Sequence, residues 1–263
     1  MEGQADNEKQ SSRKIRILLV ALWLVSILVF FFVATILINA FFILPGQNLV
    51  SLDWAGYAVA SDFANPQPVV DGVNSSWKVP TVSFSLQNTY SAAWIGIGGQ
   101  LDSTLIQIGT EQDCVNGEPT YSVWYELLPR NSVTITTVNA SPGDEITASI
   151  TLVNPAANEW SLEISDLSKA QSFEISVTYP SSRLSAEWIV ERPTVGNNLV
   201  TLANFGTITF MNSHIIFNNT VGTIGSFPHV RTIMNNRQNI RLVSVSSLAS
   251  DSASFSVRYL NYT

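Results

Sequence analysis

Hydrophobic and polar positions divide the chain into two unequal parts. Residues 17–44 contain no charged side chain, whereas residues 1–16 are polar and carry charges of both signs. A helix of the uncharged run would be about 42 Å long at a rise of about 1.5 Å per residue, against a hydrocarbon core of about 30 Å. We therefore expect residues 17–44 to form a transmembrane anchor.

The charges beside this run predict which side of the membrane each part occupies. Lys and Arg residues of the segment 1–16 precede the anchor, and basic flanks stay in the cytoplasm. We expect a single-pass protein of the cell membrane with a cytoplasmic tail at 1–16 and residues 45–263 outside the cell. A cleaved signal peptide is the alternative, but its apolar region spans only about 7–15 residues, so this run is too long for one.

Beyond the anchor, apolar positions alternate over short runs. Examples are "AAWIGIGG" at 92–99, "VTITTV" at 133–138 and "FEISVTY" at 173–179. Such runs, rich in Val, Ile, Thr and aromatic residues and separated by Pro, Gly, Asn and Asp, are typical of β-strands. No convincing helical period follows the anchor. The pattern predicts an all-β domain at 54–263, a large antiparallel β-sandwich (a concanavalin-like jelly roll), after a linker at 45–53.

Composition and charge narrow the function. The part outside the predicted membrane holds nine Lys or Arg and seventeen Asp or Glu, a formal net charge of −8. Nucleic acid is therefore not an expected partner, because it requires a basic footprint. The sparse charge would suit an acidic medium. Cys114 is the only cysteine and there are two histidines, so we expect no intrachain disulfide, no metal site and no cofactor.

Several familiar catalytic motifs are absent from the sequence. It has no Gly-x-Ser-x-Gly, no P-loop and no His-Glu-x-x-His. Carboxylates and carboxamides on predicted strands remain. In "SAEWIVE" at 185–191, Glu187, Ile189 and Glu191 share one face of a strand. Glu187 and Glu191 lie some 13 Å apart at about 3.3 Å per residue, too far to share a proton, so we expect Glu187 at a cleft edge or in water.

A string of motifs runs from about Leu52 to about Phe210. It comprises "WAGYAV" at 54–59, "VNSSWKVP" at 73–80, "AAWIGIGG" at 92–99, "LIQIGTE" at 105–111, "YSVWYELLP" at 121–129, "VNASPGDEI" at 138–146 and "AEWIVERP" at 186–193. Each motif alone is weak, but the ordered set resembles the glutamic peptidases, also called eqolisins. The resemblance implies an acid endopeptidase whose substrates are polypeptides.

Carried over by motif, the catalytic glutamine of that family falls on Gln107 and the catalytic glutamate on Glu191. One carboxyl group can take a proton from water and later give one to the leaving amine. A glutamine amide can donate its NH₂ to an oxyanion and hold a water with its C=O. The resemblance therefore implies that Glu191 acts as base and then as acid, while Gln107 positions water and stabilises the tetrahedral intermediate.

Five further residues match family positions near this pair. Glu111 and Glu126 match acidic positions that could hydrogen-bond the catalytic side chains or the substrate backbone. Trp54, Trp94 and Trp124 match aromatic positions that resemble cleft walls, where an extended peptide could lie. The alternative for each indole is a plain packing role, because large aromatic side chains fill sandwich cores in any case.

The sequence departs from the family pattern at two positions. The family's Gly-Ile-Asp-Gly is "GIGG" at 96–99, with Gly98 in place of the aspartate. A hydrogen bond from that aspartate near the catalytic water would have to come from elsewhere or be lost, which affects the pH optimum and the rate more than the identity of the pair. Glu111 replaces an aspartate and is one methylene longer.

Two other functions compete with the peptidase. Large jelly rolls often host binding modules, so a carbohydrate- or protein-binding module on the cell surface is one alternative. A structural surface protein is the other. A binding module needs an aromatic cleft but need not retain both Gln107 and Glu191. If these two side chains lie on opposite faces of the sandwich, the catalytic hypothesis fails.

Overall fold

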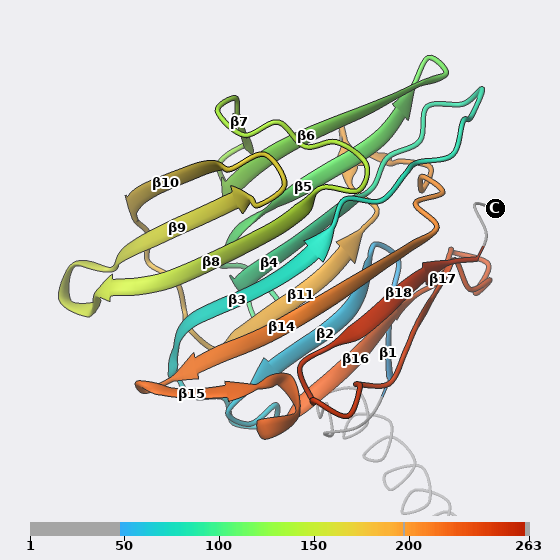
Figure 1. Ribbon diagram of the computed structural model, residues 1–263. Coiled ribbons are helices and arrows are strands. Elements are labelled where there is room, and N and C mark those ends of the chain that lie inside the picture. The colour runs from blue at the N-terminus through green and yellow to red at the C-terminus, as the bar shows by residue number, and fades with distance from the viewer. Residues whose placement is uncertain (1–47, 197, 261–263) are drawn as a thin grey trace, which may run out of the picture. The chain divides into compact units, whose positions relative to one another are not determined.

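The computed structural model describes residues 48–196 and 198–260, and these form two β-sheets stacked face to face (Figure 1). The sequence-based prediction of an all-β sandwich is confirmed. The predicted tail at 1–16, the predicted anchor at 17–44 and residues 45–47 of the predicted linker lie outside the described residues. Within the described part of the chain, no helix has the length and apolar character needed to cross a membrane.

The first sheet has eight strands in the order β1-β16-β2-β11-β4-β5-β6-β7. Their bounds are β1 (Asn48–Ser51), β16 (His229–Met234), β2 (Trp54–Ala60), β11 (Ser185–Glu191), β4 (Ala92–Gly98), β5 (Leu105–Val115), β6 (Glu118–Leu127) and β7 (Val133–Ile135).

The second sheet runs in the order β10-β9-β8-β3-β14-β18-β17, and β15 pairs with β14 beside this path. Its strands are β10 (Gln171–Thr178), β9 (Glu159–Asp166), β8 (Glu145–Asn154), β3 (Val70–Lys78), β14 (Thr207–Phe217), β18 (Phe255–Tyr259), β17 (Val243–Val245) and β15 (Thr220–Thr223). A small hairpin of β12 (Thr194–Val195) and β13 (Asn198–Leu199) and two short 3₁₀ turns, Pro155–Ala157 and Ile224–Ser226, complete the described elements.

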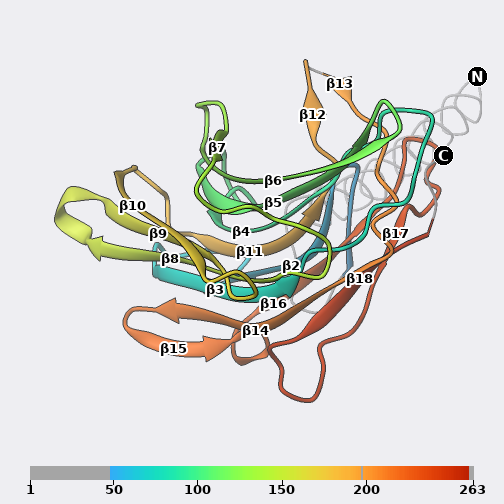
Figure 2. The ribbon, with the colours of Figure 1, turned by 45° about the horizontal axis from the view of Figure 1, so that its top comes forward.

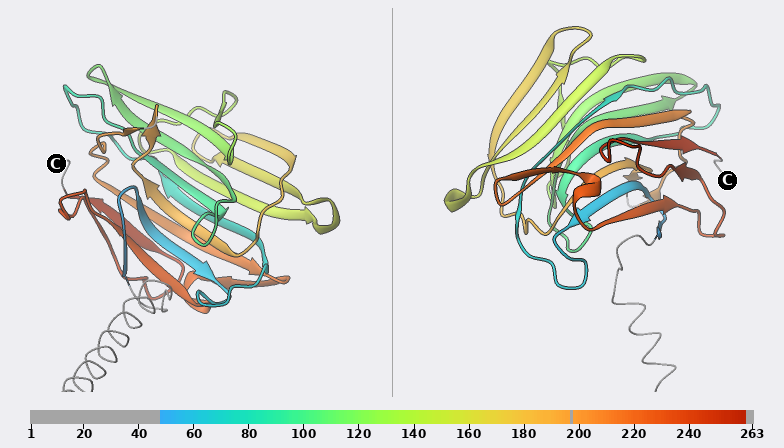
Figure 3. Two further views of the ribbon diagram at one scale, coloured as in Figure 1. Left: turned by 180° about the vertical axis from the view of Figure 1, so that it is seen from behind. Right: turned by 60° about the horizontal axis from the view of Figure 1, so that its bottom comes forward.

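The two sheets enclose one large apolar core. Alternate residues of each strand point inward, and large side chains such as Trp77, Trp160, Trp188 and Phe210 are fully buried there. Figure 3 shows the two layers from behind and from below. Buried indole N–H groups need hydrogen-bond partners, and two of them bridge the layers. Trp77 Nε1 donates to Thr110 Oγ1 at 3.0 Å, and Trp188 Nε1 donates to the carbonyl of Asn74 at 2.9 Å.

The central strands of the first sheet are buried on both faces. Every residue of β4 is buried, and so is every residue of β11 except Glu191. The inner face packs on the core, and the outer face carries a separate cluster of apolar side chains that includes Trp94, Leu105, Trp124 and Ile189. Figure 2 shows this sheet curved, with β7 and the β12–β13 hairpin rising on its two sides.

The prediction of a linker at 45–53 is wrong for residues 48–51. These residues form β1, which pairs in parallel with β16 through Asn48↔Arg231 to Ser51↔Met234. The sandwich is therefore not wholly antiparallel, and it begins before Trp54. The sequence does not reveal this strand, because its four residues are too few to show an alternating pattern and its partner β16 lies far along the chain.

Candidate active site

A cleft of about 510 Å³ opens on the outer face of the first sheet. Its volume lies in the range typical of ligand sites. The lining combines four carboxyl groups, one carboxamide and several apolar side chains. The residues are Asp53, Trp54, Ala92, Leu105, Gln107, Glu111, Trp124, Glu126, Leu128, Ser132, Glu191, Pro193, Thr194 and Val195. Six of the seven predicted site residues therefore line one cleft, and only Trp94 does not.

Strand register explains why these side chains share a face. Gln107 on β5 pairs with Glu126 on β6. Further along β5, Glu111 lies two residues after Gly109 and pairs with Ala92 on β4. Ala92 in turn pairs with Glu191 on β11. Because side chains alternate along a strand, all of them point away from the core. Gln107 and Glu191 therefore lie on the same face of the first sheet, not on opposite faces of the sandwich.

Glu191 is held in the cleft by an indole. Trp94 Nε1 donates a hydrogen bond of 2.7 Å to Glu191 Oε2. Burial raises the pKa of Glu191 to about 7, and the negative charges of Asp53 and Glu126 add to this increase, whereas the hydrogen bond from Trp94 opposes it. A carboxyl group with such a pKa can exchange protons near the working pH of an enzyme.

Gln107 and Glu126 form a second polar pair. Gln107 is only 4% exposed, and its Nε2 donates to Glu126 Oε2 at 2.6 Å. Burial raises the pKa of Glu126, although the hydrogen bond from Gln107 lowers it in part. Among the described residues, Gln107 Oε1 has no hydrogen-bond partner. That oxygen and the second hydrogen on Nε2 can therefore bind a ligand.

Glu111 continues the polar line along β5. Ser122 Oγ donates to Glu111 Oε2 at 3.2 Å, and burial raises the pKa of Glu111. Its hydrogen-bond partner Asp113 was not among the predicted site residues. Burial, together with the charge of Glu111, raises the pKa of Asp113 to about 8. The alternation of Gln107, Gly109, Glu111 and Asp113 along one strand face is the sequence signal that would have found it.

The three tryptophans have different roles. Trp54 and Trp124 line the cleft. Trp94 is fully buried, and its ring packs edge-on against Trp54 with centroids 5.0 Å apart. Room for this indole comes from two glycines, because a Cβ at Gly96 would stand 2.8 Å from the ring and a Cβ at Gly109 would stand 2.5 Å from its Cβ. Trp94 thus supports the cleft from beneath.

The expectation that Glu187 lies in water or at a cleft edge is wrong. Glu187 has no exposed surface and does not line the cleft. It pairs with Gly96 on β4 and with Ala58 on β2, so strands flank it on both sides. Burial raises its pKa well above the ordinary value, and the charge of Asp102 adds to this increase. The alternation predicted which face of β11 carries Glu187, but it did not predict that this face is buried at Glu187.

Gly98 ends β4 with a positive φ of 90°. A Cβ added there would lie 2.2 Å from the carbonyl oxygen of Thr104. An aspartate at this position, as in the family pattern, would therefore not fit this backbone.

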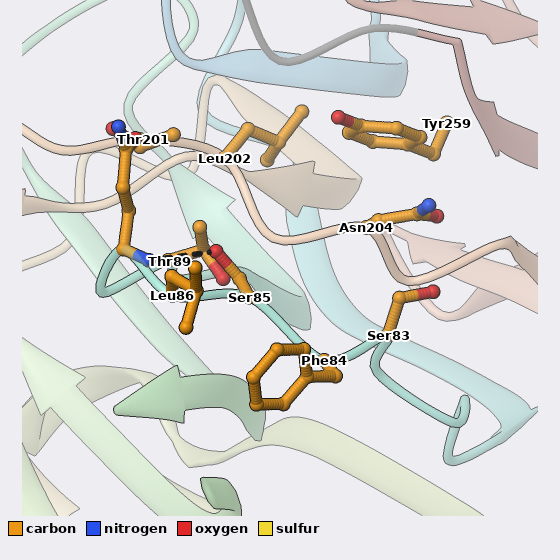
Figure 4. A pocket seen from close by; sticks show the side chains of 10 residues that line it. Ser83, Phe84, Ser85, Leu86, Thr89, Thr201, Leu202, Asn204 and Tyr259 are labelled. Carbon is orange, nitrogen blue, oxygen red and sulfur yellow. Dashed lines mark hydrogen bonds between the residues drawn. The ribbon is translucent and has the colours of Figure 1, made fainter. Parts of the chain in front are cut away.

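A second cavity, of about 400 Å³, lies elsewhere in the fold. Figure 4 shows Phe84 and Tyr259 on different sides of it, with Ser83, Thr89 and Asn204 among the polar side chains. Its lining holds no carboxyl, imidazole, amine or guanidinium group, so it offers no group for acid–base chemistry near neutral or acid pH. Within the described residues, no three His, Cys, Asp or Glu side chains are grouped so that they could hold a metal ion.

Comparison of the sequence with known proteins identifies a family, and comparison of the structure finds solved proteins with the same fold. The model of the Peptidase A4 family matches residues 52–259. Aspergillopepsin-2 of Aspergillus niger is 29% identical over 167 residues, which are 62% of this chain and 57% of that protein. The chain thus spans just over half the length of this curated relative.

Two solved structures share the fold. Scytalido-glutamic peptidase with a transition state analog inhibitor superposes with a TM-score of 0.67 at 22% identity, over 80% of this chain and 99% of the other. SCP-B, a member of the eqolisin family in complex with the tripeptide Ala-Ile-His, gives 0.62 at 23% identity over the same shares, 80% and 99%.

Proposed function

Because this chain belongs to the Peptidase A4 family, we propose that it is a glutamic-type endopeptidase that hydrolyses polypeptides at acid pH. The observation that carries the proposal is the shared cleft. Gln107 and Glu191 line the same cavity of about 510 Å³, and burial raises the pKa of Glu191 to about 7.

In the proposed mechanism, the carboxyl group of Glu191 accepts and donates the protons that are transferred. With a pKa of about 7, its carboxyl group is protonated in the acid range. As water adds to the scissile carbonyl carbon, one carboxyl oxygen accepts a proton from that water while the O–H donates to the carbonyl oxygen. When the intermediate collapses, a proton passes to the leaving amine and the carboxyl group recovers its own from the intermediate hydroxyl. The group ends neutral, as it began.

Gln107 orients the reactants. One hydrogen of its Nε2 is used by Glu126, which fixes the plane of the amide. The other hydrogen can donate to the oxygen that develops charge, and Oε1 can accept from the attacking water. Glu126 is thus a positioning residue. Trp54, Trp124 and Glu111 line the rest of the cleft and would contact the extended peptide.

Substitution of the pair tests the proposal. The purified chain should cleave a denatured protein in the acid range, and Glu191→Gln or Gln107→Ala should lower kcat/KM by about 10²–10⁴-fold, since each variant removes a proton-transfer or oxyanion group. Glu163→Gln, an exposed carboxylate on β9, is the matched control and should stay active.

Circular dichroism establishes that each variant folds. Undiminished cleavage by folded Glu191→Gln would place the chemistry on another residue. A folded wild type without activity would favour a binding module instead.

We also propose that residues 17–44 anchor this domain in the cell membrane, with residues 45–263 outside the cell. The support is the uncharged run itself, which is long enough to span a bilayer, and the basic residues before it. Substrates would then be extracellular polypeptides that reach the cleft at the cell surface.

A further inference from the structure

We propose that Asp53 is a positioning residue for the reaction: its carboxylate, fixed at the rim of the cleft by β1, holds the Glu191 carboxyl group in its protonated form. This inference rests on the proposed function, in which protonated Glu191 is the active form. Nothing in the sequence singled out Asp53, because it precedes the motif "WAGYAV" and lies in the segment expected to be a linker.

Backbone pairing places Asp53 next to Glu191. The next residue, Trp54, is the direct cross-strand partner of Glu191. The N–H of Arg192 donates to the carbonyl of Asp53 at 2.8 Å, which ties Asp53 to the residue after Glu191. Asp53 and Glu191 then both line the same cleft. Asp53 and Glu191 therefore lie close together at one end of the β2–β11 strand pair.

The carboxylate of Asp53 has a fixed orientation. Ser51 Oγ, at the end of β1, donates to Asp53 Oδ1. The same hydroxyl oxygen accepts the backbone N–H of Asp53 at 3.2 Å and that of Trp54 at 3.1 Å. These hydrogen bonds form a local turn that fixes the Asp53 side chain against Ser51. Because β1 pairs with β16, the strand found where a linker was expected is what fixes this charge.

The groups that act on Glu191 come from three strands and from the turn before one of them. Burial is the largest cause of the raised pKa of Glu191, and the negative charges of Asp53, in the turn before β2, and of Glu126, on β6, raise it further. The indoles of Trp94 on β4 and Trp54 on β2 donate hydrogen bonds that lower it. The charge of Asp53 also acts on Arg192, whose pKa is lowered by burial and raised in part by that charge.

Asp53 can be altered more cleanly than Glu126. Glu126 accepts the hydrogen bond that orients Gln107, so its substitution would change two functions at once. Asp53→Asn keeps the shape of the side chain and an oxygen for Ser51 while it removes the charge. Asp53→Glu keeps the charge. Glu163→Gln removes a carboxylate from the exposed face of β9 and serves as the control for net charge.

The measurement is the pH at which Glu191 loses its proton, followed in two ways on the full chain. The first is the high-pH limb of kcat/KM for a peptide substrate. The second needs no turnover: the Nε1–H resonance of Trp94, which is bonded to Glu191 Oε2, should move in an NMR titration as that carboxyl group ionises.

We expect Asp53→Asn to move both transitions to lower pH by about 0.5–1 unit, as a like charge several ångströms away in a partly wet cleft would predict. Asp53→Glu and Glu163→Gln should leave them within about 0.2 unit of the wild type. Added salt should narrow the gap between wild type and Asp53→Asn, because it screens the charge.

Two results would overturn the proposal. One is Asp53→Asn with both transitions unmoved; the other is an equal movement in Glu163→Gln. A wild type that cleaves no peptide while its Trp94 resonance still titrates, and still moves in Asp53→Asn, would refute the proposed function and leave the role of Asp53 intact.

Discussion

Gly98 occupies a position where the backbone itself excludes a side chain. Its φ of 90° is unfavourable for L-residues, and an added Cβ would stand 2.2 Å from the carbonyl oxygen of Thr104. Gly143 offers a matched comparison, because its φ is 91° and nothing lies within 4 Å of its added Cβ. Both positions have the strain of a positive φ, but only at Gly98 would an added Cβ also overlap a neighbouring atom.

We therefore expect Gly98→Ala to lower the free energy of unfolding by about 2–4 kcal/mol and Gly143→Ala by about 1–2 kcal/mol, since overlap adds to the backbone term only at Gly98. Urea unfolding of the two variants at one pH measures the difference. Equal losses would show that the loop with Thr104 moves aside freely, and an aspartate could then be accommodated at position 98.

At the scale of the strand, β11 carries two acids of different character. Glu191 faces the cleft, whereas Glu187 is fully buried, and this burial raises its pKa well above the ordinary value. A group whose pKa is raised by folding contributes stability below its unfolded-state pKa and loses that contribution as pH rises through its folded-state pKa. Glu187 should therefore weaken the fold as the medium becomes neutral and then alkaline.

Glu187→Gln removes this titration and keeps the volume of the side chain. We expect the urea midpoint of the wild type to fall more steeply than that of the variant between about pH 4 and pH 8, because only the wild type must ionise a buried group. Glu163→Gln should follow the wild type. Parallel curves for wild type and Glu187→Gln would mean that Glu187 keeps the same proton affinity when the protein unfolds.

Some features of the strands can be predicted from the sequence, and others cannot. Strands such as β4, β5 and β11 could be predicted, because a long alternating run leaves little choice of structure. The period of two predicted that Glu187 and Glu191 share one face of their strand, and the family motifs implied that Gln107 and Glu191 form a pair. The four residues of β1 could not be predicted, since their partner β16 lies far along the chain. The placement of Asp53 depends on the same distant pairing, and the burial of Glu187 depends on its position between β2 and β4, neither of which periodicity encodes.

At the scale of the whole molecule, the proposed anchor can be tested by asking whether the protein stays with membranes or dissolves during extraction. Full-length chain should stay with membranes after extraction at alkaline pH, whereas a variant lacking residues 17–44 should leave with the soluble proteins, because only an inserted apolar helix resists such extraction. Protease added to intact cells should digest the part at 45–263. Recovery of the full-length chain among soluble proteins would contradict the anchor.

The parallel pairing of β1 with β16 has a consequence for synthesis. Asn48 and Arg231 bond across a separation of 183 residues, and Glu191 reaches its neighbours only when β11 enters between β2 and β4. Contacts so distant in sequence form late and slowly. β4, β5 and β6 can pair as soon as they emerge from the ribosome, whereas the proposed acid–base site lacks Glu191 until β11 has been made. A nascent chain shorter than this therefore cannot carry out the proposed reaction.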